Sequence, residues 1–482
     1  MGSTSLPRAD IIVEEAQKFA SGGSIIAVLT PCKEEFANSD AILVMSGDAA
    51  VDAVGYSDGA SYAAMHCSET GQPVLMVPMP IETKGASGDI TKVGTGTSAL
   101  VVTDDPTDGV MSAVDAVLEV VEGGTVETPG IVLRLSLDGG ISFKTIRLNS
   151  ATTYEVPFIG VKLQFGTGTM VAGDRYTWTS TAPMWDATGL ASARAKLAKG
   201  QILVRTWLVI GGVDPITAGL IATEAHAYDT ENERFIFARC DIAADKTLPS
   251  WPATAAEQSA LFAGVNSWRL SIGLGRRRKL CPLTRWLWRR PVSWAASLRE
   301  YQRNMDLHNT TWWRNMPPLA GWITAQGDDE YDERVAGGAL AGRFTTFATL
   351  SNGPVGAFIA KDLTRGDEDS LFLLPNNVEV TNEACTVANA ATVRALGQSL
   401  ILTKEGTASP ESIADIQADV NSALRRALMA EHVPGRGPRV SSVRWVMSSI
   451  DDLRGPAAVV NGLLELNLRG TISQIKTRVM VA

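Results

Sequence analysis

The glycine- and hydroxyl-rich loop at residues 93–98 (VGTGTS) is the first feature of this 482-residue chain that could do chemistry, because such a loop can surround a phosphate. It lacks the Gly-Lys-Ser/Thr sequence of a phosphate-binding loop, and it precedes a predicted strand instead of joining a strand to a helix. The sequence contains no Gly-x-Ser-x-Gly elbow, so the nucleophile of an α/β hydrolase is missing from its usual place. We therefore predict neither phosphate binding nor hydrolase chemistry.

Carboxylate, histidine and cysteine side chains are the next candidates, since they supply acid–base groups and metal ligands. The acidic clusters at Asp104–Asp105 and at residues 328–333 (DDEYDE) lie near glycines and prolines, where solvated loops are the simpler interpretation. His66 stands beside Cys67, but no second pair accompanies it, so we expect a hydrogen-bonded helix histidine. The sequence thus predicts no catalytic residue, no cofactor and no metal site, and we do not expect an enzyme.

A basic, tryptophan-rich stretch from residue 276 to residue 322 is the main departure from ordinary composition. Interleaved cations and aromatic rings can stack nucleic-acid bases, and Trp and Arg are also enriched where subunits meet. The whole chain carries 52 acidic and 43 basic residues, a net charge of −9, so a basic patch complements other copies better than it suits a nucleic-acid-binding protein. We predict a subunit interface, with intramolecular packing and nucleic-acid binding as alternatives, at Arg285, Trp286, Trp288, Arg289 and Arg290.

Composition and hydropathy place the chain among multidomain globular proteins. Hydrophobic residues make up 45% of the sequence and charged residues 20%, which is enough for a substantial core. No apolar run is long enough to span a bilayer, and the N-terminus lacks a signal-peptide pattern, so we expect a soluble protein made in the cytoplasm. The five widely spaced cysteines predict reduced thiols instead of a disulfide framework: Cys32, Cys67, Cys240, Cys281 and Cys385.

The order of apolar patterns predicts an α/β fold of several domains (α+β multidomain), in which helices flank a mixed sheet and a β-rich module is inserted. Strand and helix patterns alternate up to residue 124, including a strand at 99–102 and a helix at 108–122. The period then changes to two, and Asp138-Gly139-Gly140 marks a hairpin. We divide the chain into an N-terminal arm (1–20), a first core part (21–124), an inserted β-rich domain (125–184), a second core part (185–345), a C-terminal domain (346–469) and a C-terminal arm strand (470–482).

The C-terminal domain is expected to contain two long helices, at 384–400 and 410–431, followed by strands. The second helix begins at Pro410, and its apolar residues recur at the spacing of a helix that lies on a sheet. Its opposite face carries Arg425 and Arg426, which are candidates for contact with a partner.

Both ends of the chain carry strand patterns whose edges could pair with another strand. Near the N-terminus a short apolar strand precedes two glutamates, and an alternating strand runs to the last residue. Soluble monomers usually blunt exposed strand edges with charges, prolines or cover. We predict that these strands add to the sheets of neighbouring copies; the alternative is that each completes its own sheet. The residues concerned are Ile11, Ile12, Val13, Ile472, Ile475, Thr477, Val479 and Val481.

Several segments give the chain a resemblance to the tail sheath proteins of contractile, myovirus-type bacteriophages. Residues 70–77 (TGQPVLMV) and 166–178 (GTGTMVAGDRYTW) resemble the α/β core and the inserted β domain of one sheath branch. The other segments lie in the second half of the chain: 289–302 (RRPVSWAASLREYQ), 331–344 (YDERVAGGALAGRF), 351–358 (SNGPVGAF) and 461–475 (NGLLELNLRGTISQI).

The resemblance implies a structural role. Sheath subunits stack as hexameric rings around a rigid tail tube, knit together by terminal arms, and contract to drive the tube through the host envelope. By carry-over, Ile11–Val13 would form a short N-terminal arm and residues 470–482 the C-terminal arm. On the charged face of the helix expected at 410–431, Arg425 and Arg426 are our candidates for contact with the tube.

The implied partners are neighbouring copies and the tail tube, baseplate and tail terminator proteins, without direct nucleic-acid or membrane binding. The implied location is the virion, after assembly in the host cytoplasm. Because a virion leaves the reducing cytosol for an oxidising exterior, inter-subunit disulfides become an additional alternative for the cysteines. Another tail protein of the tube or baseplate is the second interpretation, and a cytoplasmic enzyme of unrecognised type is the third.

Overall fold

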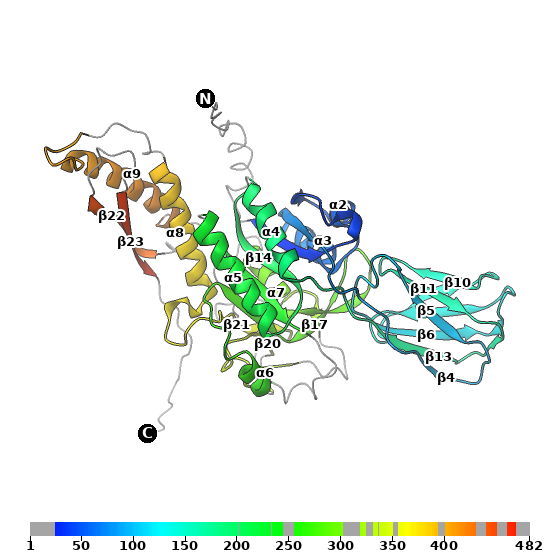
Figure 1. Ribbon diagram of the computed structural model, residues 1–482. Coiled ribbons are helices and arrows are strands. Elements are labelled where there is room, and N and C mark those ends of the chain that lie inside the picture. The colour runs from blue at the N-terminus through cyan, green and yellow to red at the C-terminus, as the bar shows by residue number, and fades with distance from the viewer. Residues whose placement is uncertain are drawn as a thin grey trace, which may run out of the picture.

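The computed structural model describes residues 25–200, 202–232, 234–243, 255–301, 319–323, 331–335, 337–349, 355–393, 401–429, 440–450 and 460–468. Figure 1 shows a central α/β core, with an antiparallel β module at one end and a helix–sheet unit at the other. The expected α+β multidomain fold class is confirmed. No helix in these ranges is both long enough and apolar enough to cross a membrane.

The core is built on an eight-stranded sheet whose strands are mostly parallel. The two edge pairs, β2 with β3 and β20 with β21, are antiparallel. In spatial order the strands are β2 (Ile42–Val44), β3 (Val74–Met79), β1 (Ile25–Pro31), β14 (Val204–Val213), β15 (Phe237–Ile242), β16 (Leu270–Leu274), β20 (Thr345–Ala348) and β21 (Phe358–Lys361).

Helices cover both faces of this sheet, which explains why its central strands have continuous apolar sequences. In β1, Ile26 and Val28 pack on one face, whereas Ala27 and Leu29 pack on the other. The first face is covered by α2 (Gly47–Val54), α3 (Asp58–Thr70) and α7 (Val292–Tyr301). The second face is covered by α4 (Ala187–Lys199), α5 (Pro215–Asn232) and α6 (Ala255–Leu261).

The β module contains antiparallel sheets around a hydrophobic core of its own. One sheet has the order β4 (Thr91–Val93), β13 (Arg175–Thr179), β6 (Asp115–Glu122), β8 (Val132–Ser136), β9 (Lys144–Arg147). Another has the order β10 (Thr153–Val156), β11 (Val161–Phe165), β5 (Leu100–Asp104), and β12 (Thr169–Met170) pairs with β7 (Gly124–Thr125). The predicted hairpin around Asp138 is present as the β8–β9 pair.

The predicted start of this module at residue 125 is wrong, because β4, β5 and β6 already belong to its sheets. Residues 115–122 of the helix predicted at 108–122 instead form the central strand β6, and the strand predicted at 99–102 pairs inside the module. The segment 115–122 (DAVLEVVE) is rich in valine, whose branched side chain fits a pleated strand better than a helix. The expectation of a helix after every strand led to the error.

The C-terminal unit consists of α8 (Pro375–Val393), α9 (Pro410–Leu428), β22 (Val440–Ile450) and β23 (Val460–Leu468), with a separate hydrophobic cluster. The predicted boundary at residue 346 is wrong, because β20 and β21 complete the core sheet. The helix predicted at 384–400 begins earlier, at Pro375, and residues 394–400 lie outside the described residues. The helix predicted from Pro410 is confirmed, with Ser409 accepting a hydrogen bond from the backbone N–H of Ser412.

Candidate interaction site

Residues 276–291, the first part of the basic, tryptophan-rich stretch, form a hairpin between the core and the β module. Strand β17 (Arg276–Leu280) pairs with β18 (Leu287–Pro291) and with β19 (Trp322–Ile323). Trp286 and Trp288 are only 4% and 3% exposed, and both belong to the hydrophobic core of the β module. The predicted subunit interface is therefore wrong for these residues: they pack within the chain, as one of the alternatives supposed.

Arg290 joins the two sides of this junction. It is buried between the rings of Trp288 and Trp294, with centroids 4.8 Å and 4.7 Å from its guanidinium carbon. Its Nη1 donates to Asp58 Oδ1 at 2.9 Å, and the same oxygen accepts a hydrogen bond from Ser112 Oγ at 2.6 Å. Because Asp58 begins α3 of the core and Ser112 precedes β6 of the module, the interaction ties the two parts together.

Further contacts hold the same hairpin against the module. Lys144 Nζ donates to the Thr284 carbonyl at 2.7 Å and lies over the Trp286 ring. Arg278 Nη1 donates to the Asp138 carbonyl at 2.8 Å. Of the five residues predicted for a subunit interface, only Arg285 and Arg289 are exposed, so little of that surface is available to a partner.

The residues considered for chemistry form local structural contacts. The backbone N–H groups of Thr95 and Gly96 donate to Asp174 Oδ1 at 2.9 Å and 3.1 Å. A Cβ added at Gly96 would lie 2.0 Å from the other oxygen of this carboxylate. Burial raises the pKa of the Asp174 carboxyl, but hydrogen bonds from backbone N–H groups outweigh it and lower the pKa overall. The chain's own carboxylate thus occupies the loop that resembled a phosphate site.

His66 is a buried helix residue, as the sequence indicated. The hydroxyl of Tyr62 lies 3.3 Å from His66 Nδ1, and burial lowers the pKa of His66 to about 3. Among the described residues no group of three or more His, Cys, Asp and Glu side chains is arranged to hold a metal ion. The thiols of Cys32, Cys240 and Cys281 are buried, and those of Cys67 and Cys385 are half-buried.

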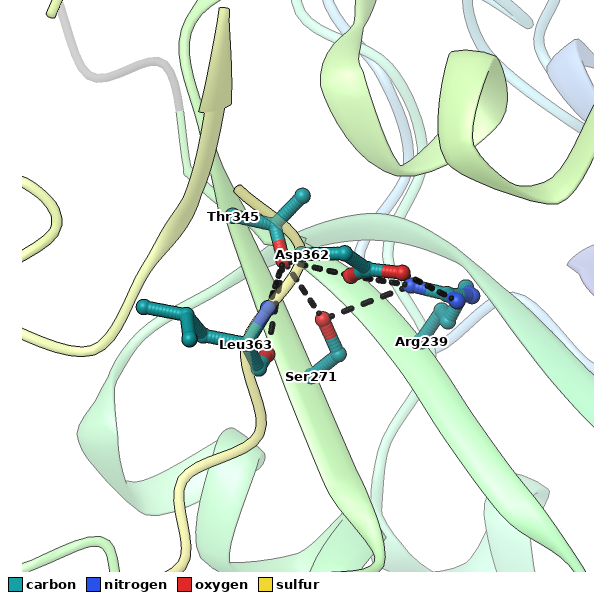
Figure 2. Close-up of polar contacts among 5 residues, drawn as sticks. All are labelled: Arg239, Ser271, Thr345, Asp362 and Leu363. Carbon is teal, nitrogen blue, oxygen red and sulfur yellow. Dashed lines mark hydrogen bonds and ion pairs between the residues drawn. The ribbon is translucent and has the colours of Figure 1, made fainter. Parts of the chain in front are cut away.

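A polar network inside the core sheet was not predicted from the sequence (Figure 2). The Arg239 guanidinium makes two bonds of 2.8 Å to the Asp362 carboxylate, and both side chains are buried. Thr345 Oγ1 donates to Asp362 Oδ1 at 2.8 Å and lies 2.9 Å from Ser271 Oγ. The network links β15, β16 and β20 to the segment after β21. A buried charge is costly unless it is paired and hydrogen-bonded, and here each charge has its partner. The network therefore holds the strands at this edge of the sheet together.

The β22–β23 hairpin forms a two-stranded sheet with one covered face and one exposed face. Its two strands pair with each other alone in the described ranges. Val443, Trp445 and Met447 of β22 pack toward α8 and α9, whereas Arg444 and Glu465 lie on the exposed face. A two-stranded sheet with a helical cover on one face retains strand edges that can accept a further strand.

The residues predicted for strand addition, Ile11 to Val13 and Ile472 to Val481, lie outside the described residues, so those predictions stay predictions. Arg425 and Arg426 are exposed on α9, while Val420, Leu424 and Leu428 on the same helix are buried. The predicted amphipathic character of this helix is therefore confirmed, and contact of the two arginines with a tube is untested.

No family model matches the sequence, and a search of curated proteins finds no match. Among solved structures, the chain is similar to a chain of the "Cryo-EM structure of the anti-feeding prophage (AFP) baseplate, 6-fold symmetrised". The two chains are 11% identical with a TM-score of 0.39, and the alignment covers 63% of this chain and 76% of that chain. This likeness is too weak to assign a family or a role to the chain.

Proposed function

We propose that this protein is a structural subunit of a contractile, phage-type tail and that it forms the sheath around the tail tube. The observation that carries the proposal is the β22–β23 sheet, which pairs with no other strand in the described part of the chain. Strand addition from another copy would join subunits through backbone hydrogen bonds without requiring a rigid shape fit. The resemblance of residues 461–475 to sheath sequences supports this role for the sheet.

Contraction requires subunits that stay connected while they change their packing. A backbone ladder between an arm and a neighbouring sheet can persist while rigid bodies rotate, and the energy for contraction is stored when the extended state is assembled. The proposed partners are neighbouring copies, the tail tube, the baseplate and the tail terminator, and the proposed location is the virion. Cofactors and catalysis have no part in this mechanism.

Removal of residues 471–482 tests the proposal. We expect the truncated chain to fold, because its described hydrophobic clusters are all formed before residue 469, and to fail to polymerise. Circular dichroism and sedimentation velocity measure the two properties. Long tubes from the truncated chain would contradict the proposal, and rings of the intact chain that never elongate would favour a baseplate component.

A point substitution in the C-terminal segment tests strand pairing without shortening the chain. Val479→Pro keeps all residues but removes a backbone donor, so it should prevent polymerisation as the truncation does. Val479→Ile is the matched control, because it keeps a branched residue that suits a strand. The two variants should have the same thermal stability as monomers.

A further inference from the structure

The outer edge of β22 is occupied at its centre by a side chain of α9. Asn421 Oδ1 accepts a hydrogen bond from the backbone N–H of Trp445 at 2.7 Å. Asn421 Nδ2 donates to the backbone carbonyl of the same tryptophan at 2.9 Å. One side-chain amide therefore satisfies both backbone groups of one strand residue, as a residue of a neighbouring strand would.

The pattern of an antiparallel ladder shows which edge this is. The N–H and C=O of a strand residue point to the same edge, and successive residues alternate between the two edges. Trp445 lies opposite Leu464 of β23, but its N–H and C=O are bonded to Asn421. They consequently point away from β23, to the side on which another strand would add.

Asn421 is held in this position by its own helix and by the packing around Trp445. Asn421 Nδ2 also donates to the Gln417 carbonyl at 2.7 Å, one turn earlier in α9. Val420 and Leu424, which flank it, are buried against the sheet. Gly462 leaves space for the indole of Trp445, since a Cβ there would lie 2.3 Å from the ring. An incoming strand at β22 would have to displace a restrained amide.

Charges on the exposed face of the hairpin also favour strand addition at β23 over strand addition at β22. Arg444 of β22 and Glu465 of β23 lie opposite each other on this face. In the C-terminal segment, Lys476 and Arg478 alternate with Ile475, Thr477 and Val479, so apolar residues on the helix side put the cations on the exposed side. The cations would then lie beside Glu465 at the β23 edge, but beside Arg444 at the β22 edge. Opposite charges stabilise cross-strand neighbours, and like charges destabilise them.

We propose that Asn421 closes the outer edge of β22 to strand addition, so that residues 470–482 of a second copy add at the outer edge of β23. The inference rests on the proposed function, since it specifies which edge of the hairpin receives the arm. It makes Asn421 a positioning residue that prevents the hairpin from pairing on both sides.

Cross-linking between two differently tagged copies tests the choice of edge. Val446→Cys and Leu463→Cys form a matched pair, because these residues lie opposite each other in the ladder and share the exposed face with Arg444 and Glu465. Each is mixed with a copy carrying Met480→Cys, under assembly conditions, with a short bis-maleimide. The chain without added cysteines sets the background from the native thiols.

With Asn421 intact, we expect cross-linking of Leu463→Cys to exceed that of Val446→Cys by about tenfold, the bias that two ordinary hydrogen bonds can provide. Asn421→Ala should raise the Val446→Cys yield several-fold. Gln417→Ala is the control that should leave it unchanged, because the hydrogen bond from Asn421 goes to the backbone carbonyl of Gln417, which the substitution keeps.

Equal yields at the two positions, or cross-links only at Val446→Cys, would overturn the choice of edge while leaving assembly by strand addition intact. A lack of cross-links between copies that nevertheless form tubes would also overturn it. Failure of the intact chain to form tubes or cross-links would contradict the proposed function itself. If Asn421→Ala does not fold, the comparison of the two positions in the parent chain still decides the question.

Discussion

The two antiparallel hairpins β17–β18 and β22–β23 differ in what surrounds them. The first contributes Trp286 and Trp288 to the core of the β module and places Arg290 in a buried ion pair. The second packs one face on α8 and α9 and exposes the other, with Leu463 53% exposed. The hairpin with the composition of an interface is thus internal, and the hairpin with ordinary alternating leucines is the accessible one.

This difference shows that enrichment of Trp and Arg does not identify a subunit contact by itself. Aromatic rings and guanidinium groups suit any junction between two large apolar surfaces, including one between two parts of a single chain. Availability of unpaired backbone groups is the better indicator of polymerisation, because strand addition depends on the ladder more than on side chains. Variants in the two hairpins should therefore affect different properties.

Arg290→Ala is expected to have the largest effect on stability. Removal of Arg290 leaves the Asp58 carboxylate without its cation and opens space between two tryptophans, so the free energy of unfolding should fall by about 3–5 kcal/mol. Arg289→Ala, on the exposed side of the same strand, should lower it by less than about 1 kcal/mol, because the contacts of an exposed charged side chain contribute little. Chemical denaturation measures both, and equal effects would contradict the buried assignment of this hairpin.

Asp241, in strand β15 of the core, should make the stability of the fold depend on pH. Its carboxylate accepts hydrogen bonds from the backbone N–H and the hydroxyl of Ser293 in α7, and Arg276 and Arg239 are the nearby charges. Burial nonetheless raises the pKa of Asp241 to about 6 from the ordinary 3.8. The folded state therefore binds the proton more tightly than the unfolded state, and this group favours folding increasingly as the pH falls from about 7 to about 4.

Asp241→Asn should remove that contribution. Relative to the parent chain, the variant should be more stable by up to about 3 kcal/mol at pH 7.5, and the difference should disappear near pH 4. Thermal unfolding of both chains across this range is the measurement. A difference that does not change with pH would show that folding does not raise the pKa of Asp241.

Reversal of charge on α9 should have the smallest effect on stability. Arg425→Glu with Arg426→Glu changes two exposed side chains, so unfolding should shift by less than about 1 kcal/mol, mainly through the helix dipole. If these residues face the tail tube, co-sedimentation with purified tubes should weaken. Lys404→Glu, exposed in the same unit, is the control. Unchanged co-sedimentation of the double variant would exclude the predicted contact.

Local patterns allowed much of the fold to be predicted, including β1, β3, α3, α4, α5 and the β8–β9 hairpin. The error at β6 arose because a valine-rich segment after a strand suits either a helix or a strand until its neighbours are known. The seating of Trp288 and the ion pair of Arg290 with Asp58 depend on residues far apart in sequence, which periodicity does not register. The contact of Asn421 with the sheet could have been predicted, because this amide lies beside the apolar positions Val420 and Leu424 of a helix expected to lie on a sheet.

Amide hydrogen exchange of β23 tests the central claim most directly. Leu464 and Leu466 lie opposite Trp445 and Val443, where backbone groups point to the outer edges, whereas Glu465 points toward β22. Exchange is compared between monomers and assembled particles, with fragmentation that resolves single amides. We predict that the Leu464 and Leu466 amides are unprotected in the monomer and become protected on assembly, while Glu465 is protected in both. Assembled particles in which Leu464 and Leu466 still exchange freely would contradict the account.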